Sequence, residues 1–413
     1  MARIQLALYR LIGFGISWLA PLIMAIRRAK GKEDRDRYTE KYGIAGHQRP
    51  PGKMIWINAV GLGEILSSRA LINALLDRDP QLNFLVTSST KVSAEVFARN
   101  LPPNTIHQYL PLDCKKFTDR FLTHWAPDIA IWIEQDFWPG FVIDAHARGI
   151  KQIQINGRMD ERSLQNRQKW QRLYSLAYSK LHFVAAQDQN SAENLALLSG
   201  HEVDVLPNLK IVSPPLKVSE TKVVAWAERL ADRFVWMAAS AHIPDIEVAI
   251  EAHKEICKIN PSCCLIIVPR FPDYASQISQ LVSAHNLGVA LSSNEQSAQV
   301  IIETGFGNSG MWYELARCAL IGGSFGTTEG HNPWEAVQHN CAVLHGTRIR
   351  NFSSDFALLA DVCGSVRVSN AHELLHALKH VDFDDLSNAA NWVVTDQKKI
   401  LRPHFDRIFG LIS

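Results

Sequence analysis

Short hydrophobic runs recur along most of the chain, and each is followed by a turn and then by a segment with helical spacing. The run at 54–58 is separated by a Gly-containing turn from apolar positions at helical spacing over 65–76. This alternation is typical of parallel βαβ units whose sheet is covered on both faces. The same pattern predicts further strands at 84–88, 129–133, 153–155, 183–186, 235–239, 264–268, 300–302, 319–321 and 342–344.

The alternation is interrupted once. The segment 207–215 (PNLKIVSPP) holds three prolines without periodicity, which predicts a linker between two halves. We therefore expect two doubly wound α/β domains, at 33–212 and 213–390, with an interdomain cleft at the carboxyl ends of their strands. Residues 391–413 are predicted to form a mostly helical, amphipathic segment that can pack back on the first domain.

The N-terminal region has a different pattern. Residues 11–26 are apolar and carry no charge, and Arg27, Arg28, Lys30 and Lys32 follow. The run is somewhat shorter than the roughly 20 residues that span a bilayer. Residues 1–32 are therefore predicted to be an uncleaved anchor at the cytoplasmic face of the inner membrane, either dipping into it or just spanning it. A buried core helix is the alternative.

Composition narrows the function classes. A formal net charge of +2 over 413 residues argues against a dedicated nucleic-acid binder. The seven cysteines form no CxxC pair, which is typical of reduced thiols, and no Cys/His cluster has the spacing of a metal site. We expect neither a metal nor another cofactor.

One predicted strand leads into a glycine-rich turn and a marked helix start. The run at 318–321 is followed by Gly322, Gly323 and Ser324, and then by Asn332 and Pro333. Asn is a good N-cap and Pro is favoured at the first helical position. Such a helix start offers N–H groups to an anion, with a nucleotide phosphate as the leading choice. An ordinary glycine-rich turn with a capped helix is the alternative.

Polar side chains follow several other predicted strands. Glu64 suits a general base, but acidic residues are also favoured in the first turn of any helix. Arg158 and Arg162 share a face if their segment is helical, and they suit a carboxylate or phosphate. A solvated helix start is the alternative for the two arginines. The remaining candidates are Glu134, Ser240, His242 and Arg270 at strand ends and Lys210 at the linker. A capping role is the alternative for Glu134, and a solvated side chain is the alternative for Lys210.

Taken together, these segments resemble the 3-deoxy-D-manno-octulosonic acid (Kdo) transferases of lipopolysaccharide synthesis. The resemblance covers nearly the whole chain, and GHNPxE is its most specific motif. The matching motifs are GE at 63–64, ExxxWP at 134–139, NxRxxERS at 156–163, NLK at 208–210, VPRxP at 268–272 and GGS…GHNPxE at 322–335.

The resemblance implies a GT-B fold with an acceptor-binding first half and a CMP-Kdo-binding second half. It implies inverting, metal-independent transfer of Kdo from CMP-Kdo to a lipid A precursor at the inner membrane. Glu64 is then the general base, and Glu134 and Lys210 stabilise the transition state. Contacts to CMP are implied for Pro269, Arg270, Phe306, Gly307, Asn308, Asn332, Pro333, Trp334 and Glu335.

The chain departs from the family pattern on the donor side. Asn308 stands where the family has Glu, Ile243 stands where it has Glu, and Trp334 stands where Leu is usual. An amide can hydrogen-bond a ribose or a cytosine edge, but it supplies no charge. Two alternatives therefore remain: a transferase for another CMP-activated acidic sugar or another glycan acceptor, or a non-catalytic, membrane-attached binding paralogue.

Overall fold

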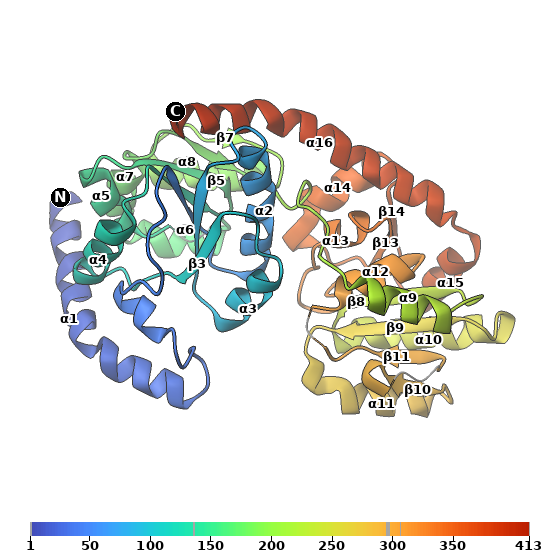
Figure 1. Ribbon diagram of the computed structural model, residues 1–413. Coiled ribbons are helices and arrows are strands. Elements are labelled where there is room, and N and C mark those ends of the chain that lie inside the picture. The colour runs from blue at the N-terminus through green and yellow to red at the C-terminus, as the bar shows by residue number, and fades with distance from the viewer. Residues whose placement is uncertain (1, 135–136, 295–297, 306, 413) are drawn as a thin grey trace. The chain divides into compact units, whose positions relative to one another are not determined.

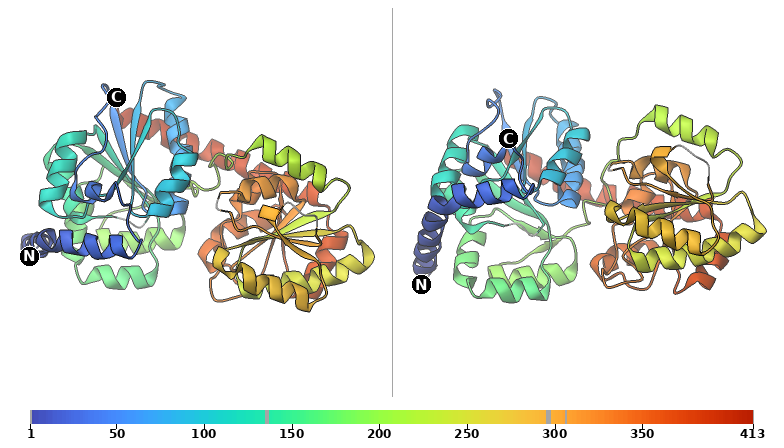
Figure 2. Two further views of the ribbon diagram at one scale, coloured as in Figure 1. Left: turned by 60° about the horizontal axis from the view of Figure 1, so that its bottom comes forward. Right: turned by 90° about the horizontal axis from the view of Figure 1, so that it is seen from below.

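The computed structural model describes residues 2–134, 137–294, 298–305 and 307–412. The chain divides into two compact units (Figure 1). The first comprises Met1–Ser213 together with Gln397–Ser413, and the second comprises Pro214–Asp396. Each unit is a parallel sheet with helices on both of its faces (Figure 2). The predicted doubly wound α/β fold is confirmed for both units.

In the described part of the first unit, the sheet has the strand order β3-β2-β1-β4-β5-β6-β7 and every pairing is parallel. The central strand β1 pairs with β2 on one side and with β4 on the other, so the order of the strands reverses there. Loops at such a reversal leave a crevice in which ligands of doubly wound sheets bind. The strands are β1 (Met54–Asn58), β2 (Asn83–Ser88), β3 (Thr105–Tyr109), β4 (Ile129–Ile133), β5 (Lys151–Gly157), β6 (Val184–Ala186) and β7 (Asp204–Val205).

An aromatic cluster under this sheet builds the first core. Trp56 of β1 packs against Trp132 of β4, with ring centroids 5.0 Å apart, and both contact Phe141. All residues of β1 and β4 are buried, because helices cover both faces of the parallel sheet. The helices of this unit are α1 (Ala2–Ala29), α2 (Leu62–Leu76), α3 (Lys91–Arg99), α4 (Lys115–Trp125), α5 (Pro139–Ala147), α6 (Glu161–Gln168), α7 (Gln171–Tyr178) and α8 (Gln189–Ser199), with the end of α16 (Phe383–Ile412).

The N-terminal helix α1 does not belong to this core. It packs against α4, α5 and α7, yet only 11% of its most apolar 18-residue window is buried. By length and composition it is the one helix among the described residues that could cross a membrane. A buried core helix, which the sequence left open, does not fit this exposure.

The second unit repeats the topology of the first. Its described strands are all parallel in the order β10-β11-β9-β8-β12-β13-β14, and the order reverses between β8 and β12. The strands are β8 (Val235–Ala241), β9 (Cys264–Pro269), β10 (Val289–Leu291), β11 (Val300–Ile302), β12 (Cys318–Ile321), β13 (Ala342–His345) and β14 (Ser365–Arg367).

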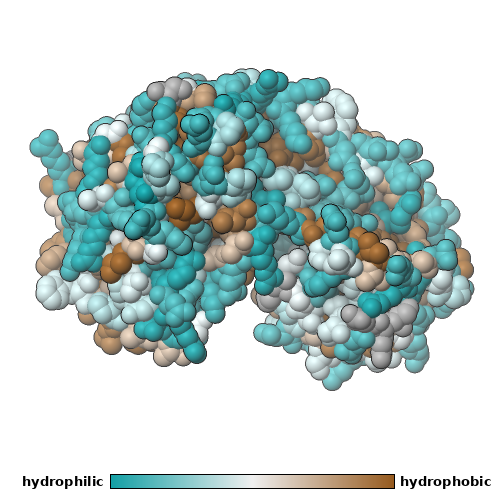
Figure 3. Space-filling view, viewed as in Figure 1, coloured by the Kyte–Doolittle hydropathy of each residue, from teal (hydrophilic) through white to brown (hydrophobic). Residues whose placement is uncertain are grey.

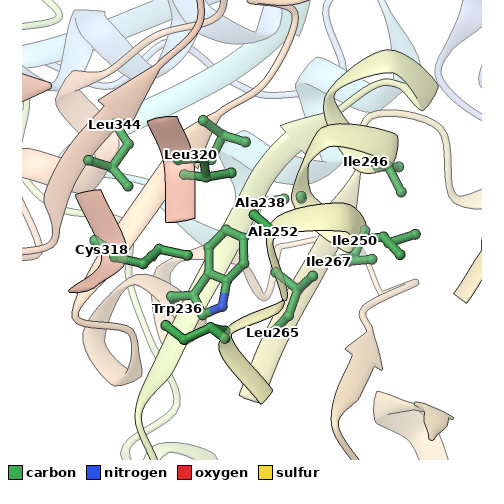
Figure 4. Close-up of a cluster of buried hydrophobic side chains, with 14 of the residues drawn as sticks. Trp236, Ala238, Ile246, Ile250, Ala252, Leu265, Ile267, Cys318, Leu320 and Leu344 are labelled. Carbon is green, nitrogen blue, oxygen red and sulfur yellow. The ribbon is translucent and has the colours of Figure 1, made fainter. Parts of the chain in front are cut away.

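Small and branched side chains fill the second core around one indole (Figure 4). Trp236 of β8 is fully buried among Leu265 and Cys318 of the neighbouring strands, and its Nε1 donates to Nδ1 of His253 at 3.1 Å. Ile250 closes the cluster from the covering helix α10. The helices of this unit are α9 (Glu220–Arg229), α10 (Ile243–Ile259), α11 (Ala275–Ala284), α12 (Ser309–Leu315), α13 (Trp334–Val337), α14 (Ser353–Asp361), α15 (Ala371–His380) and the first part of α16.

Every strand predicted from the sequence is present, with ends that differ by a few residues at most. Four further strands, β3, β7, β10 and β14, were not predicted. The C-terminal helix begins at Phe383 rather than near 391. The helix predicted to start at Asn332 is a single turn that begins at Trp334, with Pro333 as its N-cap residue.

Candidate functional site

Glu64 lies in the first turn of α2, directly after β1. Its Oε2 accepts hydrogen bonds from the backbone N–H groups of Val60 at 2.8 Å and Gly61 at 3.2 Å. The carboxylate therefore caps its own helix, as acidic residues at this position do. The side chain is half-buried, so the same carboxylate remains accessible to a substrate hydroxyl. The capping role and the general-base role are compatible in this geometry.

Glu134 and Lys210 form a buried ion pair. Lys210 Nζ lies 2.5 Å from Glu134 Oε1, and the two side chains are 10% and 6% exposed. Asn156 donates from Nδ2 to the same carboxylate oxygen at 3.3 Å, and its Oδ1 accepts the backbone N–H of Leu209 at 3.0 Å. The ExxxWP, NxRxxERS and NLK motifs, which are far apart in the sequence, thus meet within the first unit.

Backbone conformation marks the same strand ends. Glu134 after β4 and Asn156 in β5 have φ values of 57° and 53°. Ser240, near the end of β8 in the second unit, has φ 51°. The left-handed region is unfavourable for residues with a side chain, and such strain concentrates at functional sites. For Glu134, a hydrogen bond of 2.8 Å from Gln154 Nε2 to its carbonyl oxygen helps to hold this conformation.

Lys210 lies beside the glycine of the GE motif in α2. A Cβ atom placed on Gly63 would lie 3.4 Å from Lys210 Cε and 3.9 Å from its Nζ. The lysine therefore lies over the start of the helix that carries Glu64. Glu64, Glu134 and Lys210 all lie around the carboxyl ends of β1 and β4, where the strand order reverses.

The two candidate arginines do not share a helix face. Helix α6 begins at Glu161, so Arg158 lies in the preceding loop while Arg162 lies in the first turn. Asp160 caps this helix by accepting the N–H of Ser163 at 2.7 Å. That hydrogen bond lowers the pKa of Asp160, and the two guanidinium groups nearby lower it further. Both arginines thus surround a carboxylate of the chain itself.

In the second unit, the Gly-Gly-Ser turn also binds a carboxylate of the chain. Asp245 is fully buried and accepts the N–H groups of Gly323 at 2.7 Å, Ser324 at 3.0 Å and Phe325 at 3.1 Å. It also accepts the N–H of His242 at 2.8 Å. The N–H groups of this turn are therefore already occupied, whereas the predicted anion site is the helix start that follows at Asn332. The spacing of Asp245, three residues after His242, is that of a capping box and was the overlooked signal.

The segment Asn332–Glu335 gives a weaker helix terminus than predicted. Asn332 Oδ1 accepts the N–H of Trp334 at 3.1 Å, but the helix that follows has only four residues. A dipole of one turn is small compared with that of a long helix. Trp334 is fully buried and donates from Nε1 to Asp355 Oδ1 at 2.7 Å, whereas Glu335 is half-buried. The indole that replaces the usual Leu is therefore a packing residue.

Two histidines face each other at the reversal point of the second sheet. The rings of His242 and His331 are stacked, with centroids 5.2 Å apart and planes inclined by 9°, and their Nε2 atoms lie 2.9 Å apart. Burial, with His242 and Arg270 nearby, lowers the pKa of His331 to about 4. Burial also lowers the pKa of His242. Both rings are hence neutral at pH 7. His331 was not predicted as a site residue.

The other described donor-side candidates lie at the end of β9 and in the segments that follow β9 and β11. Pro269 ends β9, and exposed Arg270 donates its backbone N–H to the carbonyl of Ala241 at 2.9 Å. Asn308 is the N-cap residue of α12 and makes no capping hydrogen bond with its side chain, and Gly307 beside it has φ 84°. Phe306 lies outside the described residues.

A buried carboxylate near this loop was also missed by the sequence interpretation. Glu303 directly follows β11 and is 4% exposed. It accepts the N–H of Gly305 at 2.5 Å and Nε1 of Trp312 at 2.7 Å. These bonds fix the start of the loop that leads to Asn308.

Solved structures define the fold class. A UDP-N-acetylglucosamine 2-epimerase from Listeria monocytogenes matches 86% of this chain and 98% of its own, with a TM-score of 0.56 and 12% identity. HepE of Anabaena, solved with UDP and glucose, matches 87% of this chain and 98% of its own, with a TM-score of 0.54 and 12% identity. With its two doubly wound units, this chain has the GT-B fold that the sequence predicted.

The sequence relatives are more specific. Residues 36–213 match the family model of the 3-deoxy-D-manno-octulosonic-acid transferases. A probable mitochondrial 3-deoxy-D-manno-octulosonic acid transferase of Arabidopsis thaliana is 32% identical over 84% of this chain and 80% of its own length. The enzyme of Rickettsia bellii is 28% identical over 91% of both chains. The chain belongs to the family of 3-deoxy-D-manno-octulosonic acid transferases, which confirms the resemblance drawn from its motifs.

Proposed function

We propose that this protein transfers Kdo from CMP-Kdo to a lipid A precursor, with inversion at the anomeric carbon and without a metal ion. The observation that carries the proposal is the convergence of Glu64, Glu134 and Lys210 at the reversal point of the first sheet. Perturbed geometry and paired charges at such a point are typical of catalytic sites. Membership of the Kdo transferase family supports the choice of donor.

In the proposed reaction, Glu64 removes the proton from an acceptor hydroxyl group. The freed oxygen forms a bond to the anomeric carbon of Kdo, while the bond from that carbon to the phosphate of CMP breaks. The bonding electron pair leaves with CMP, so negative charge builds on the phosphate. Lys210 supplies positive charge, and Glu134 holds the lysine in position through the 2.5 Å contact.

On the donor side, we propose the stacked histidines and Arg270 as phosphate ligands, because the helix that follows Asn332 has only four residues. The hydrogen bond between the two neutral rings uses the Nε2–H of one of them, so the other ring can donate its Nδ1–H, and Arg270 supplies positive charge. We assign acceptor contacts to Arg158 and Arg162. The remaining donor contacts are assigned to Ser240, Pro269, Phe306, Gly307, Asn308, Asn332, Pro333 and Glu335. Buried Trp334 supports this site through packing.

We further propose that the protein acts at the cytoplasmic face of the inner membrane, attached by α1. A lipid acceptor resides in that membrane, and α1 exposes large apolar side chains over most of its length. Attachment would concentrate enzyme and acceptor on one surface.

Substitution of Glu64 by Gln tests the catalytic assignment. Because the amide cannot take a proton, transfer should fall by about 10²–10⁴-fold. Product is measured by mass spectrometry after incubation with CMP-Kdo and a tetra-acylated lipid A precursor, and CMP affinity, measured by calorimetry, should not change. Glu220→Gln, at the first turn of α9, is the matched control. Undiminished transfer by Glu64→Gln would contradict the proposal.

A second candidate function follows from Asn308. An amide in place of the family's Glu removes a charge from the donor loop, which would suit another CMP-activated acidic sugar or a binding role without turnover. Competing donors in the same assay distinguish these cases. If CMP-Kdo is the natural donor, it should be used faster than other CMP-activated acidic sugars, whereas absent CMP binding would favour the non-catalytic paralogue.

A further inference from the structure

Helix α1 has a narrow polar stripe that is bound to the first unit. Tyr9 donates its hydroxyl to Asp113 at 2.6 Å, and Arg10 contacts Asp144 at 2.7 Å. Gln5 accepts the backbone N–H of Leu173 at 2.9 Å. Asp113 directly precedes α4, Asp144 lies in α5 and Leu173 lies in α7. The three contacts therefore hold the N-terminal half of α1 against three different parts of the first unit.

The same stripe continues with small residues toward the C-terminal half of α1. A Cβ atom on Gly13 would lie 3.3 Å from the carbonyl oxygen of Asp113, so the helix lies close against the unit. Ala20 and Met24 are buried, and the hydroxyl of Tyr42 donates to the carbonyl of Ala20 at 3.4 Å. The helix is therefore docked along most of its length.

The opposite face of α1 is almost entirely apolar. Trp18 is 74% exposed, and the space-filling view shows apolar residues along the lower left edge, where Figure 1 places α1 (Figure 3). Basic residues lie at both ends of this face, with Arg3 at the start and Lys30 and Lys32 just beyond the helix. The exposed large residues of the face are Ile4, Leu8, Leu11, Ile12, Phe14, Ile16, Trp18, Leu19, Leu22, Ile23 and Ile26.

From these two faces we infer that α1 lies in the plane of an anionic lipid surface, with its apolar face in the acyl boundary and its polar stripe on the first unit. The inference rests on the proposed function for the presence of a membrane, and it adds the mode of attachment. In this mode α1 lies parallel to the membrane plane, whereas a spanning anchor would cross it.

A spanning orientation conflicts with the docking contacts. A helix of 28 residues is about 42 Å long, which is comparable to a whole bilayer. If α1 crossed the membrane while docked, α4 and its exposed Lys115 and Lys116 would enter the hydrocarbon with it. Charged groups there are strongly disfavoured. If α1 undocked instead, Arg10 and Asp144 would lose their ion pair.

In the orientation parallel to the membrane, the apolar face of α1 contacts lipid while its polar stripe keeps its contacts with the first unit. Apolar side chains reach the acyl boundary, Trp18 suits the interface, and terminal basic residues meet anionic headgroups. A second copy of the chain would also cover the apolar face, but the basic residues at both ends of α1 would then repel their counterparts if two helices paired in parallel. The charge pattern therefore favours lipid over a second copy.

Spin labels at three positions along the exposed face of α1 provide the test. The full chain with Cys363→Ser, which replaces the exposed cysteine, carries a nitroxide at Leu8→Cys, Phe14→Cys or Leu22→Cys in turn. The protein is bound to vesicles of phosphatidylcholine and phosphatidylglycerol. The rates at which the nitroxide collides with oxygen and with a water-soluble nickel complex then report how deep each label lies in the bilayer. We expect all three labels within the shallow boundary region, roughly 5–10 Å below the headgroups, with the label at Phe14 no deeper than the other two. A deep label at Phe14 with shallow labels on either side would overturn the inference.

Flotation with the same vesicles tests the apolar face itself. Trp18→Glu/Leu22→Glu should reduce vesicle binding by roughly tenfold or more. Val92→Glu/Leu197→Glu, which changes two other exposed apolar residues of the first unit, should leave binding unchanged. Equal losses in both variants, or a lipid-free dimer that only the Trp18 variant abolishes, would overturn the inference. Neither experiment uses substrate, so vesicle binding without Kdo transfer would contradict the proposed function alone.

Discussion

At the scale of single residues, the clearest feature is a lysine and a carboxylate that are both nearly buried. Glu134 contacts Lys210 and is held in place by Asn156, which donates to its carboxylate, and by Gln154, which donates to its backbone carbonyl. A buried ion pair contributes little net stability over apolar residues of the same volume, but an unpaired buried charge is very unfavourable. The pair is therefore better explained by chemistry at the site than by stability.

Lys210→Met should destabilise the first unit by about 3–5 kcal/mol, because Glu134 is then left charged and buried without its partner. The double variant Lys210→Met/Glu134→Gln removes both charges and should recover much of that loss. Urea unfolding monitored by tryptophan fluorescence measures both. If the double variant is no more stable than Lys210→Met, the two residues are not coupled and this account is wrong.

At the scale of elements, the loops after β8 and β12 share one acceptor. Asp245 binds the backbone of both loops, and Ser324 extends the connection by accepting the N–H of Gly346 at 2.8 Å. A Cβ atom on Gly322 would lie only 2.5 Å from the carbonyl oxygen of Ser240, so these loops are in close contact. The arrangement fixes His242 and His331 relative to each other within the second unit.

Asp245→Ala should therefore convert the turn at Gly323–Phe325 into an open anion site. Adjacent N–H groups without an internal acceptor bind phosphate, and a ligand of the folded state raises its stability. We expect inorganic phosphate to raise the melting temperature of this variant more than that of the parent. Asp273→Ala, at an exposed position, is the control. An identical response of variant and parent to phosphate would contradict the prediction.

At the scale of the whole molecule, buried histidines in both units set the response to acid. Burial lowers the pKa of His107 to about 3 and those of His253, His331 and His345 to about 4. Between these values and 6.5 the unfolded chain binds more protons than the folded one, so stability falls as pH falls. Asp113, whose pKa burial raises to about 6, acts in the opposite direction between 3.8 and 6.

The stability of the folded state should therefore decrease from pH 7 to pH 5, because the destabilising effect of the four histidines exceeds the stabilising effect of one carboxyl group. His253→Gln should reduce this decrease, because Gln does not titrate and can still bond Trp236 and the carbonyl of Gln299. Urea midpoints at the two pH values measure the effect, and His372→Gln at an exposed position is the surface control. An unchanged pH dependence in His253→Gln would contradict the assignment.

The C-terminal part of α16 completes the first unit. Lys53 and Lys151 donate to the carbonyls of Ile412 and Leu411 at 2.8 and 2.6 Å, and Arg78 pairs with Asp406. Truncation after Asp396 should lower the melting temperature of the first unit while CMP binding by the second persists. Calorimetric melting with and without CMP measures both, and an unchanged first-unit transition would contradict the role assigned to this segment.

Hydrophobic patterning identified the strands whose residues are nearly all apolar, because a strand buried on both faces of a parallel sheet needs such a run. It missed β3, in which Thr105, His107 and Gln108 are buried polar residues, and the short edge strand β7, whose two residues are exposed. Polar residues that are satisfied by tertiary hydrogen bonds leave no mark in a hydrophobic pattern.

The sequence by itself determined the two α/β halves, the family and the order of the motifs, because these depend on local periodicity and on residue identity. Only the tertiary structure decided which groups meet: that Lys210 reaches Glu134, that His331 faces His242, and that Asp245 fills the Gly-Gly-Ser turn. It also revealed that α1 is docked through Arg10. Contacts between residues distant in the chain depend on how the sheets order their strands, which no local pattern records.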